Sequence, residues 1–366
     1  MMRLTIPFAL ALSFAAGAFA QGHGGSCTCG GPAVVPVRWE IDHPDPAYAA
    51  AAKEAFERWN AYVDVFDARA GDGTMGANGK NEIAFLDIAT ASARYGINMD
   101  RSTFAITYMA PLSAAGDFDG CPRPPDAVCG TFDETDVIVN ADFLRGWKPS
   151  GPPDFTDHGP ALYAATACHE LGHSLGFHHN VDNISVMNLY EDFAAQYIAT
   201  ADTQEARAAF PARVRRVADL ALYPFYFDPA LTDYAATTPV EVSPAAVLPG
   251  GSITIRNFGF ENVGTEAFPD VSIRFYLSPS LPSGGPDILI GLLAFSGPAP
   301  AGAFWDDDRA GVTFVIPSAT PAGTYSVRAA ISDTSGAADS IAYNNGWIAP
   351  GQVAVVALGR RRAARH

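Results

Sequence analysis

Three histidines occur at spacings that can build a metal site. His169 and His173 are four residues apart, so on a helix both imidazoles leave the same face, one turn apart. That arrangement can place two ring nitrogens about 2.0–2.1 Å from one zinc ion. Gly176 can end the helix in a left-handed conformation and turn the chain, so that His179 supplies a third nitrogen. The sequence therefore predicts a zinc site shared by three histidines.

Glu170 follows the first histidine and completes the arrangement of a catalytic site. Three protein ligands leave the fourth zinc position to water, which is typical of catalytic rather than structural zinc. Zinc lowers the pKa of that water, and a neighbouring carboxylate can take the proton and pass it to a leaving amine. Imidazole ligands favour zinc over calcium or magnesium. We therefore expect Glu170 to be the general base of peptide-bond hydrolysis.

Two other residues compete for the third ligand position. His178 is adjacent to His179, but only His179 has the Gly-x-x-His spacing after Gly176. Glu191 lies farther downstream and could serve in the other large class of enzymes with a His-Glu-x-x-His core. That choice leaves Gly176 and His179 without a role. A comparison of His179→Ala with Glu191→Ala separates the two interpretations.

The elements that must position these residues form an α+β plan with a mixed sheet. A long helix is expected over residues 46–63, where apolar side chains recur at helical spacing. The histidines fall in an Ala-rich helix over 161–175, and a last helix over 203–222 is broken or restarted at Pro211. The expected strands are residues 34–41, 82–88, 103–109 and 136–140. Together these elements predict a first domain over residues 34–231, which carries the three histidines and Glu170.

A second domain is expected after a linker over residues 232–249. From 250 to 358 the pattern is all β, with Gly, Pro, Ser and Asp clusters between strands, which is typical of a small immunoglobulin-like sandwich. Its expected strands are residues 252–256, 271–277, 288–295, 312–316, 325–331 and 352–358. We find no catalytic cluster there, and we interpret residues 306–308, three aspartates, as a loop. Residues 359–366 form a basic tail.

The N-terminus has the pattern of a secretory signal. A basic start and an apolar run end in Ala18-Phe19-Ala20, which fits the small-x-small cleavage rule and predicts a signal peptide over residues 1–20. A Gly- and Cys-containing leader follows over residues 21–33. We therefore expect a secreted, extracellular protein, and no later stretch is apolar enough to span a bilayer. The net charge of −16 argues against a nucleic-acid partner, because phosphate binding needs a basic face.

The five cysteines fit export, because disulfides persist outside the cytoplasm. Cys121 and Cys129 flank a Pro-rich loop and are the favoured pair, while the odd count leaves at least one thiol free or paired outside the chain. Cys27 and Cys29 lie on the leader, upstream of the zinc site. Their position motivates the hypothesis that one of them caps the zinc until oxidation or cleavage frees it.

The run HELGHSLGFHH from His169 to His179 resembles the metzincin signature HExxHxxGxxH, and Ser185-Val186-Met187-Asn188 resembles the Met-turn of that clan. The spacing between them is short, as in matrixins. The resemblance implies a zinc endopeptidase acting on proteins or peptides, with Met187 as a hydrophobic floor beneath the zinc. It also implies that an edge strand, residues 136–140, pairs with an extended peptide; the alternative is that these residues form an ordinary sheet strand.

Some family features do not carry over. Tyr190 is one position beyond the place of the tyrosine that follows the Met-turn in astacin-like enzymes, so we leave it out of the site. His43 and His158 are too few for the second, structural zinc of matrixins. Calcium is a further expectation for three loop aspartates, in competition with their being solvated loop acids: Asp117, Asp119 and Asp133.

The C-terminal module resembles the CARDB-type, immunoglobulin-like modules of bacterial surface proteins. The resemblance lies in the Pro-Gly-Gly-Ser start at 249–252, the VSIRFYLS strand at 271–278 and the late Asn344-Asn345. It implies a cell-surface or matrix ligand.

The expected function is a secreted zinc endopeptidase. The alternative is an extracellular adhesion or binding protein whose zinc domain is catalytically silent, and the intact Glu170 argues against it.

Overall fold

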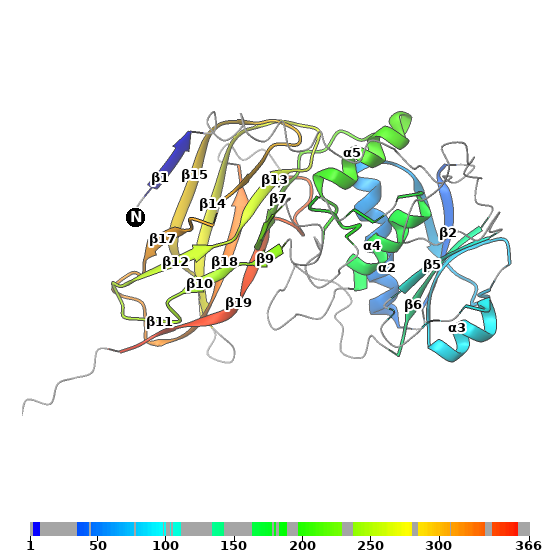
Figure 1. The fold of residues 1–366 in the computed structure, drawn as a ribbon, viewed down its shortest axis with the longest axis horizontal. Helices are drawn as coiled ribbons and strands as arrows, with labels where there is room; N and C mark the ends of the chain where they lie inside the picture. The colour runs from blue at the N-terminus through cyan, green and yellow to red at the C-terminus, as the bar shows by residue number, and fades with distance from the viewer. Residues whose placement is uncertain are drawn as a thin grey trace, which may run out of the picture.

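The computed structural model describes a large part of the chain, divided between a lobe of helices and strands and a lobe of strands (Figure 1). The described residues are 3–7, 35–43, 45–76, 78–97, 99, 103, 105–110, 134–142, 163–177, 179–180, 183–188, 197–228, 237–279, 285–307, 309–333 and 339–357. Several predictions lie outside them: the signal peptide beyond Pro7, the leader, the basic tail, and the residues Cys27, Cys29, Cys121, Cys129, Asp117, Asp119, Asp133, His158, His178, Tyr190 and Glu191.

A five-stranded mixed sheet forms the centre of the first lobe, in the order β3-β2-β4-β6-β5. Its strands are β2 (Val37–Asp42), β3 (Phe66–Ala70), β4 (Asn81–Leu86), β5 (Ala105–Ala110) and β6 (Glu134–Asn140). The first four in the order are parallel, and β5 runs antiparallel to β6. The predicted mixed sheet is therefore present in this lobe.

The prediction that residues 136–140 form the edge strand is wrong. These residues belong to β6, which lies between β4 and β5, and the edge strand on this side is β5. Every residue of β6 is buried. A strand that is covered on both faces carries a continuous β-branched run, and Val137-Ile138-Val139 is such a run.

Two helices pack on one face of this sheet. The Asp45 side chain caps α2 (Pro46–Tyr62), accepting from the Ala47 amide at 2.8 Å. The indole of Trp59 on α2 donates to the Cys168 carbonyl of α4 (Tyr163–Ser174) at 2.8 Å and joins the two helices. Their shared core also contains Trp39 and other sheet residues. The long helix and the histidine-bearing helix are therefore as predicted, within one or two residues at their ends.

A helix that the sequence did not predict covers the other face. Asp87 caps α3 (Ile88–Tyr95), and Gly96 ends it in a left-handed conformation with a φ of 69°. Its Ala91 and Tyr95 side chains pack with alternate residues of β4 and β6 in a small separate cluster. The sheet is therefore sandwiched between helices at its centre.

The second lobe is a β-sandwich. Its strands are β1 (Arg3–Pro7), β7 (Leu220–Tyr223), β8 (Phe225–Phe227), β9 (Thr237–Pro239), β10 (Glu241–Ser243), β11 (Ala246–Val247), β12 (Ser252–Arg256), β13 (Gly259–Asn262), β14 (Phe268–Pro279), β15 (Ile288–Ala299), β16 (Phe304–Asp306), β17 (Val312–Val315), β18 (Gly323–Ser332) and β19 (Gly346–Val355). Six form one sheet, β1-β15-β14-β18-β19-β11, and β10-β12-β17 and β16-β13-β7 form two smaller sheets. Large apolar side chains such as Phe258, Phe275 and Trp347 fill the space between them.

The two lobes share strand β7. The helix predicted over 203–222 is wrong in its second half: α5 (Thr200–Ala209) ends before Pro211, which starts the short 3-10 turn η1 (Pro211–Arg213). The chain then extends into β7, which pairs with β13 of the sandwich. Leu220 and Leu222 point into the sandwich core, whereas Ala221 and Tyr223 belong to the core of the first lobe. Strands β9, β10 and β11 lie within the predicted linker 232–249.

Candidate metal centre

The three predicted histidines come together at the end of α4. The Nε2 atom of His173 lies 3.1 Å from that of His169 and 3.2 Å from that of His179. Nitrogens about 2.0–2.1 Å from a tetrahedral zinc lie about 3.3 Å from one another. The two separations from His173 are therefore close to those that one tetrahedral ion would require, and all three ligand nitrogens lie within 4.8 Å of one another.

Gly176 produces the turn that brings His179 to the other two histidines. Its φ of 92° lies in the left-handed region, as the sequence predicted. The Phe177 amide donates back to the Gly172 carbonyl at 3.1 Å, which closes the helix C-terminus with a wide turn. The chain turns away from the helix axis at Gly176, so the His179 ring can face the His173 ring although it is only six positions farther along the chain.

Backbone carbonyls fix the orientation of two of the rings. His169 donates from Nδ1 to the Val186 carbonyl, and His173 donates from Nδ1 to the Phe177 carbonyl, each at 2.7 Å. A carbonyl only accepts, so each Nδ1 carries the proton and each Nε2 presents a lone pair to the centre. Burial, together with repulsion from His179, lowers the pKa of His169 to about 4. The His169 ring is therefore neutral near pH 7, and the lone pairs of His169 and His173 that face the centre suit a cation.

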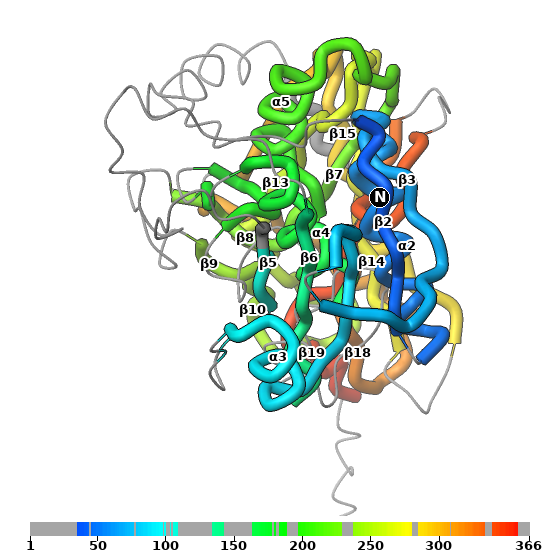
Figure 2. Tube along the Cα trace, turned by 90° about the vertical axis from the view of Figure 1, so that its right-hand side faces the viewer, coloured from blue at the N-terminus to red at the C-terminus, as the bar shows by residue number. Residues whose placement is uncertain are grey.

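Glu170 lies beside the histidines with a partner that the sequence analysis missed. Thr107 of β5 lies with its hydroxyl 2.5 Å from Glu170 Oε2 and 3.0 Å from the Glu170 main-chain carbonyl. Figure 2 shows β5 and β6 running past α4 in this region. Burial raises the pKa of Glu170, while the nearby His173 and the Thr107 hydroxyl oppose that rise. The carboxylate is thus held in place by the edge strand of the sheet.

Met187 packs directly against the helix that carries the ligands. It is fully buried, and a Cβ added at Gly172 would overlap its Sδ atom. The Asn180 amide donates to the Met187 carbonyl at 2.8 Å, so the segment after His179 is tied to the same turn. Gly172 is therefore required for the close approach of Met187 to α4.

Asp202, near the start of α5, holds the Met187 turn in place. One carboxylate oxygen accepts from the Ser185 hydroxyl, and the other accepts from the Val186 and Ala199 amides, both at 2.8 Å. Burial raises the pKa of Asp202 to about 6. Since Val186 also accepts from His169, Asp202 acts on the metal site through one intervening residue. The only local signal for Asp202 is an acid in the first turn of a helix, which also occurs in many helices without such a role.

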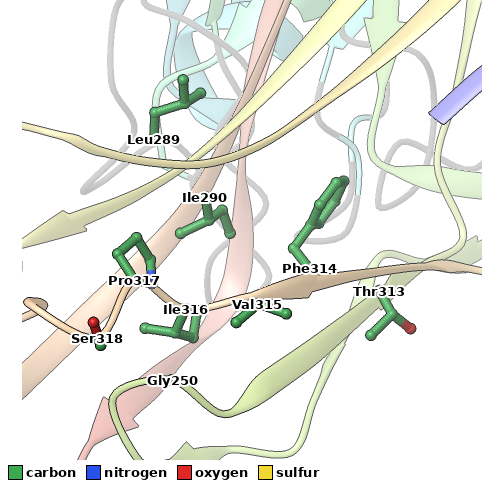
Figure 3. A pocket seen from close by; sticks show the side chains of 9 residues that line it. All are labelled: Gly250, Leu289, Ile290, Thr313, Phe314, Val315, Ile316, Pro317 and Ser318. Atoms are coloured by element: carbon green, nitrogen blue, oxygen red, sulfur yellow. The ribbon is translucent and has the colours of Figure 1, made fainter. Parts of the chain in front are cut away.

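Two other features do not belong to the metal centre. Cys168 is buried next to His169, burial raises the pKa of its thiol to about 12, and its Sγ lies 3.6 Å from the Ala55 carbonyl. A groove in the sandwich between β15 and β17 is lined by nine residues, none of them titratable (Figure 3). Neither feature therefore adds a ligand to the histidine group.

Comparisons with known proteins give a limited result. No family model and no curated protein matches the chain. Among solved structures, the CARDB domain of the PF1109 protein from Pyrococcus furiosus, solved with di-metal ions, is 17% identical, with a TM-score of 0.23 over 38% of this chain and 90% of that chain.

Two further structures are the sporulation control protein Spo0M from Bacillus subtilis and a β-glucosidase from Erythrobacter marinus. They are 12% and 13% identical, with TM-scores of 0.21 and 0.22. The matches cover 39% and 38% of this chain, and 51% and 16% of those chains. At these TM-scores no argument about function follows. CARDB domains are among the structural neighbours of the chain.

Proposed function

We propose that the chain is a zinc-dependent endopeptidase of the metzincin type. The observation that carries the proposal is the convergence of three imidazole Nε2 atoms, from His169, His173 and His179, at 3.1 and 3.2 Å around His173. Three neutral nitrogen donors with space for a fourth ligand are the donor set of catalytic zinc. Among the residues that the structure describes, these histidines are a group able to hold a metal ion.

Glu170 performs the proton transfers in the proposed reaction. A bound zinc supplies Lewis-acid chemistry and lowers the pKa of a water molecule that it binds. The Glu170 carboxylate takes a proton from the attacking water and then delivers it to the nitrogen of the scissile bond. Its pKa is raised by burial, which makes it a stronger base than an exposed carboxylate. The Thr107 hydroxyl orients it through Oε2.

Strand β5 is the proposed docking edge for the substrate. One side of β5 pairs with β6, and no strand among the described residues pairs with its other side. An extended peptide can add to such an edge through main-chain hydrogen bonds. Thr107 lies on β5 and contacts Glu170, so a peptide on this edge would pass close to the general base. This arrangement favours unfolded or extended protein substrates.

The remaining parts of the proposal concern location and the second lobe. We propose export through the N-terminal signal over residues 1–20, and a CARDB-type module in the sandwich that binds a cell-surface or matrix ligand. Within the part of the chain that the structure describes, no helix is both long and apolar enough to cross a membrane. Calcium is a further proposed cofactor. The alternative of a catalytically silent binding protein predicts the same zinc content but no hydrolysis.

Cleavage of casein by the purified full chain tests the peptidase proposal. We expect cleavage by the parent, loss of cleavage on chelation and its return with zinc. Glu170→Gln should keep its zinc and lose at least about 100-fold in kcat/KM, since a general base contributes about 100- to 10,000-fold. Glu57→Gln, which changes an exposed carboxylate paired with Lys53 on α2, is the matched control and should be fully active. Equal cleavage by the parent and Glu170→Gln would overturn the proposed mechanism.

A further inference from the structure

A second group of possible metal ligands lies on the sheet, on the face opposite α2 and α4. Glu40 and Asp42 are two residues apart on β2, so they point to the same face, and Glu40 is the register partner of Glu82 on β4. One carboxylate oxygen from each residue lies within 4.8 Å of the other two. Neighbouring parallel strands therefore bring three carboxylates to one point.

The spacing of these oxygens fits one calcium ion. Calcium binds oxygen ligands at about 2.3–2.6 Å, so two ligands on opposite sides of the ion lie at most about 5 Å apart. The 4.8 Å limit on the three carboxylate oxygens falls within that range. Carboxylates can bind through one or both oxygens, and water can complete the six to eight ligands that calcium takes.

The negative charge of the group is only partly offset by its described neighbours, because Arg69 of β3, the register partner of Glu40, pairs with Asp67 at 2.6 Å. Glu82 is fully buried and Asp42 is 9% exposed. Lys80 is the cation at the rim, and its Nζ lies 3.2 Å from Glu40 Oε2 and 2.6 Å from an oxygen of Asp72. Its charge is therefore shared with a fourth acid, Asp72, which is itself exposed. Three carboxylates together in a poorly solvated place repel one another unless a cation lies between them.

The Asp42 carboxylate is the most direct sign of a missing ligand. Its Oδ1 accepts from the Gly73 amide at 2.7 Å. Its Oδ2 is buried and has no hydrogen-bond partner among the described residues. A buried carboxylate oxygen without a partner is costly, and it is rare in native proteins. Asp42 also contributes one carboxylate oxygen to the group with Glu40 and Glu82, so an ion bound there through Oδ2 would satisfy that oxygen.

The loop over residues 71–80 is shaped to cover this point. A Cβ added at Gly71 would overlap the Asp42 carboxylate, so only glycine lets the backbone approach so closely. Farther along the loop, the Gly76 amide donates to Glu82 Oε2 at 3.3 Å, and the Asn78 side chain donates to both Glu82 oxygens at 3.2 and 3.3 Å. The loop is thus attached to the two most buried carboxylates of the group.

We propose that Glu40, Asp42 and Glu82 bind a calcium ion that fastens the 71–80 loop to the sheet. The all-oxygen ligand set separates this site from the nitrogen-lined histidine centre, because hard cations prefer carboxylates and zinc prefers imidazole. Magnesium is disfavoured, since it demands a near-octahedral shell and gives up its water reluctantly. This calcium site is distinct from the one expected from the sequence at Asp117, Asp119 and Asp133.

The test measures calcium binding by the zinc-loaded full chain after removal of calcium. Equilibrium dialysis with radioactive calcium gives the number of ions bound, and a thermal melt gives the stabilisation. The variants are Asp42→Asn and Glu82→Gln, each of which removes one proposed ligand charge. Asp67→Asn is the matched control, because Asp67 lies on the neighbouring strand β3, is 40% exposed and pairs only with Arg69 among the described residues.

For the parent and for Asp67→Asn we expect saturable binding in the micromolar to millimolar range and a rise of about 5 °C in the melting midpoint at saturating calcium. Asp42→Asn and Glu82→Gln should each weaken binding by at least about 10-fold, with almost no rise. Without calcium, Asp42→Asn should melt no lower than the parent, since it removes one of several buried like charges. Asp42→Asn should therefore fold and test the proposal even if Glu82→Gln does not fold. Parent protein that binds no calcium at about 10 mM, or equal binding by Asp42→Asn and the parent, would overturn the proposal.

Discussion

Replacing Asp202 should damage the metal centre although Asp202 is not a ligand. Its carboxylate accepts three hydrogen bonds, from the Ser185 hydroxyl and from the Val186 and Ala199 amides, and two of these donors belong to the turn that carries Met187. The Val186 carbonyl in turn accepts from His169 Nδ1 at 2.7 Å. Asp202→Ala would release the turn, and the His169 ring would lose the carbonyl that fixes its orientation.

The size of the effect can be worked out from these contacts. Three buried donors left without an acceptor cost about 1–3 kcal/mol each. Removal of the carboxylate returns part of this cost. Burial raises the pKa of Asp202 to about 6, so keeping its carboxylate charged in the folded protein near pH 7 costs about 3 kcal/mol. We expect a net loss of about 3 kcal/mol in the free energy of unfolding. Loss of a partner of a ligating histidine typically weakens metal binding by about 10- to 100-fold.

Zinc affinity and urea unfolding, measured on the same preparations, check this prediction. Glu205→Ala is the matched control, because it removes an acid one helical turn farther along α5. Burial and the nearby Asp202 raise the pKa of Glu205 to about 7, and the turn that carries Met187 is not among the causes. We expect the control to bind zinc like the parent. If Asp202→Ala unfolds more easily but binds zinc as tightly as the parent, the turn does not orient His169 and the reasoning is refuted.

Three further predictions follow from the same structure. Gly176→Ala, at a φ of 92°, should lower the free energy of unfolding by about 1–2 kcal/mol and weaken zinc binding by displacing His179. Gly96→Ala, at a φ of 69°, should lower the free energy of unfolding as much but leave zinc binding unchanged. Equal zinc affinities in the two variants would contradict this. Thr107→Val should lower kcat/KM and move the acidic limb of the kcat/KM–pH profile to higher pH, because the Thr107 hydroxyl lowers the pKa of Glu170. Thr107→Ser keeps the hydroxyl and should behave like the parent. An unshifted pH profile in Thr107→Val would count against this role. Burial raises the pKa of Asp219 to about 8, so its contribution to stability is present at low pH and is lost as the pH rises from about 4 to 8. Melting midpoints at pH 6 and 8.5 should differ less for Asp219→Asn than for the parent, and an unchanged difference would exclude Asp219 as a source.

The sequence was sufficient where the signal is local. The spacing of His169 and His173 and the glycine before His179 predicted both the helix and the sharp turn, because four-residue spacing and a left-handed glycine are properties of adjacent residues. The α2 helix was found for the same reason. The approach of the three histidines to one another could therefore be predicted before any tertiary structure was known.

The residues that sequence analysis missed depend on contacts distant along the chain. Thr107 meets Glu170 across 63 positions, and nothing in a single strand threonine signals that contact. The position of β6 inside the sheet depends on strand order, which local patterns do not encode. The sequence predicts helix at Leu220 and Leu222, where a short apolar run has no clear period. They form a strand because β13 offers backbone groups to pair with and the sandwich offers a core to fill.

Zinc content of the purified chain tests the central claim most directly. The parent, His179→Ala and Glu191→Ala would be compared by elemental analysis after dialysis against a weak chelator. The account predicts one zinc per chain in the parent and in Glu191→Ala, and a large loss in His179→Ala, because the ring of His179 supplies the third converging nitrogen. A parent without zinc, or a His179→Ala variant that retains all of it, would contradict the account.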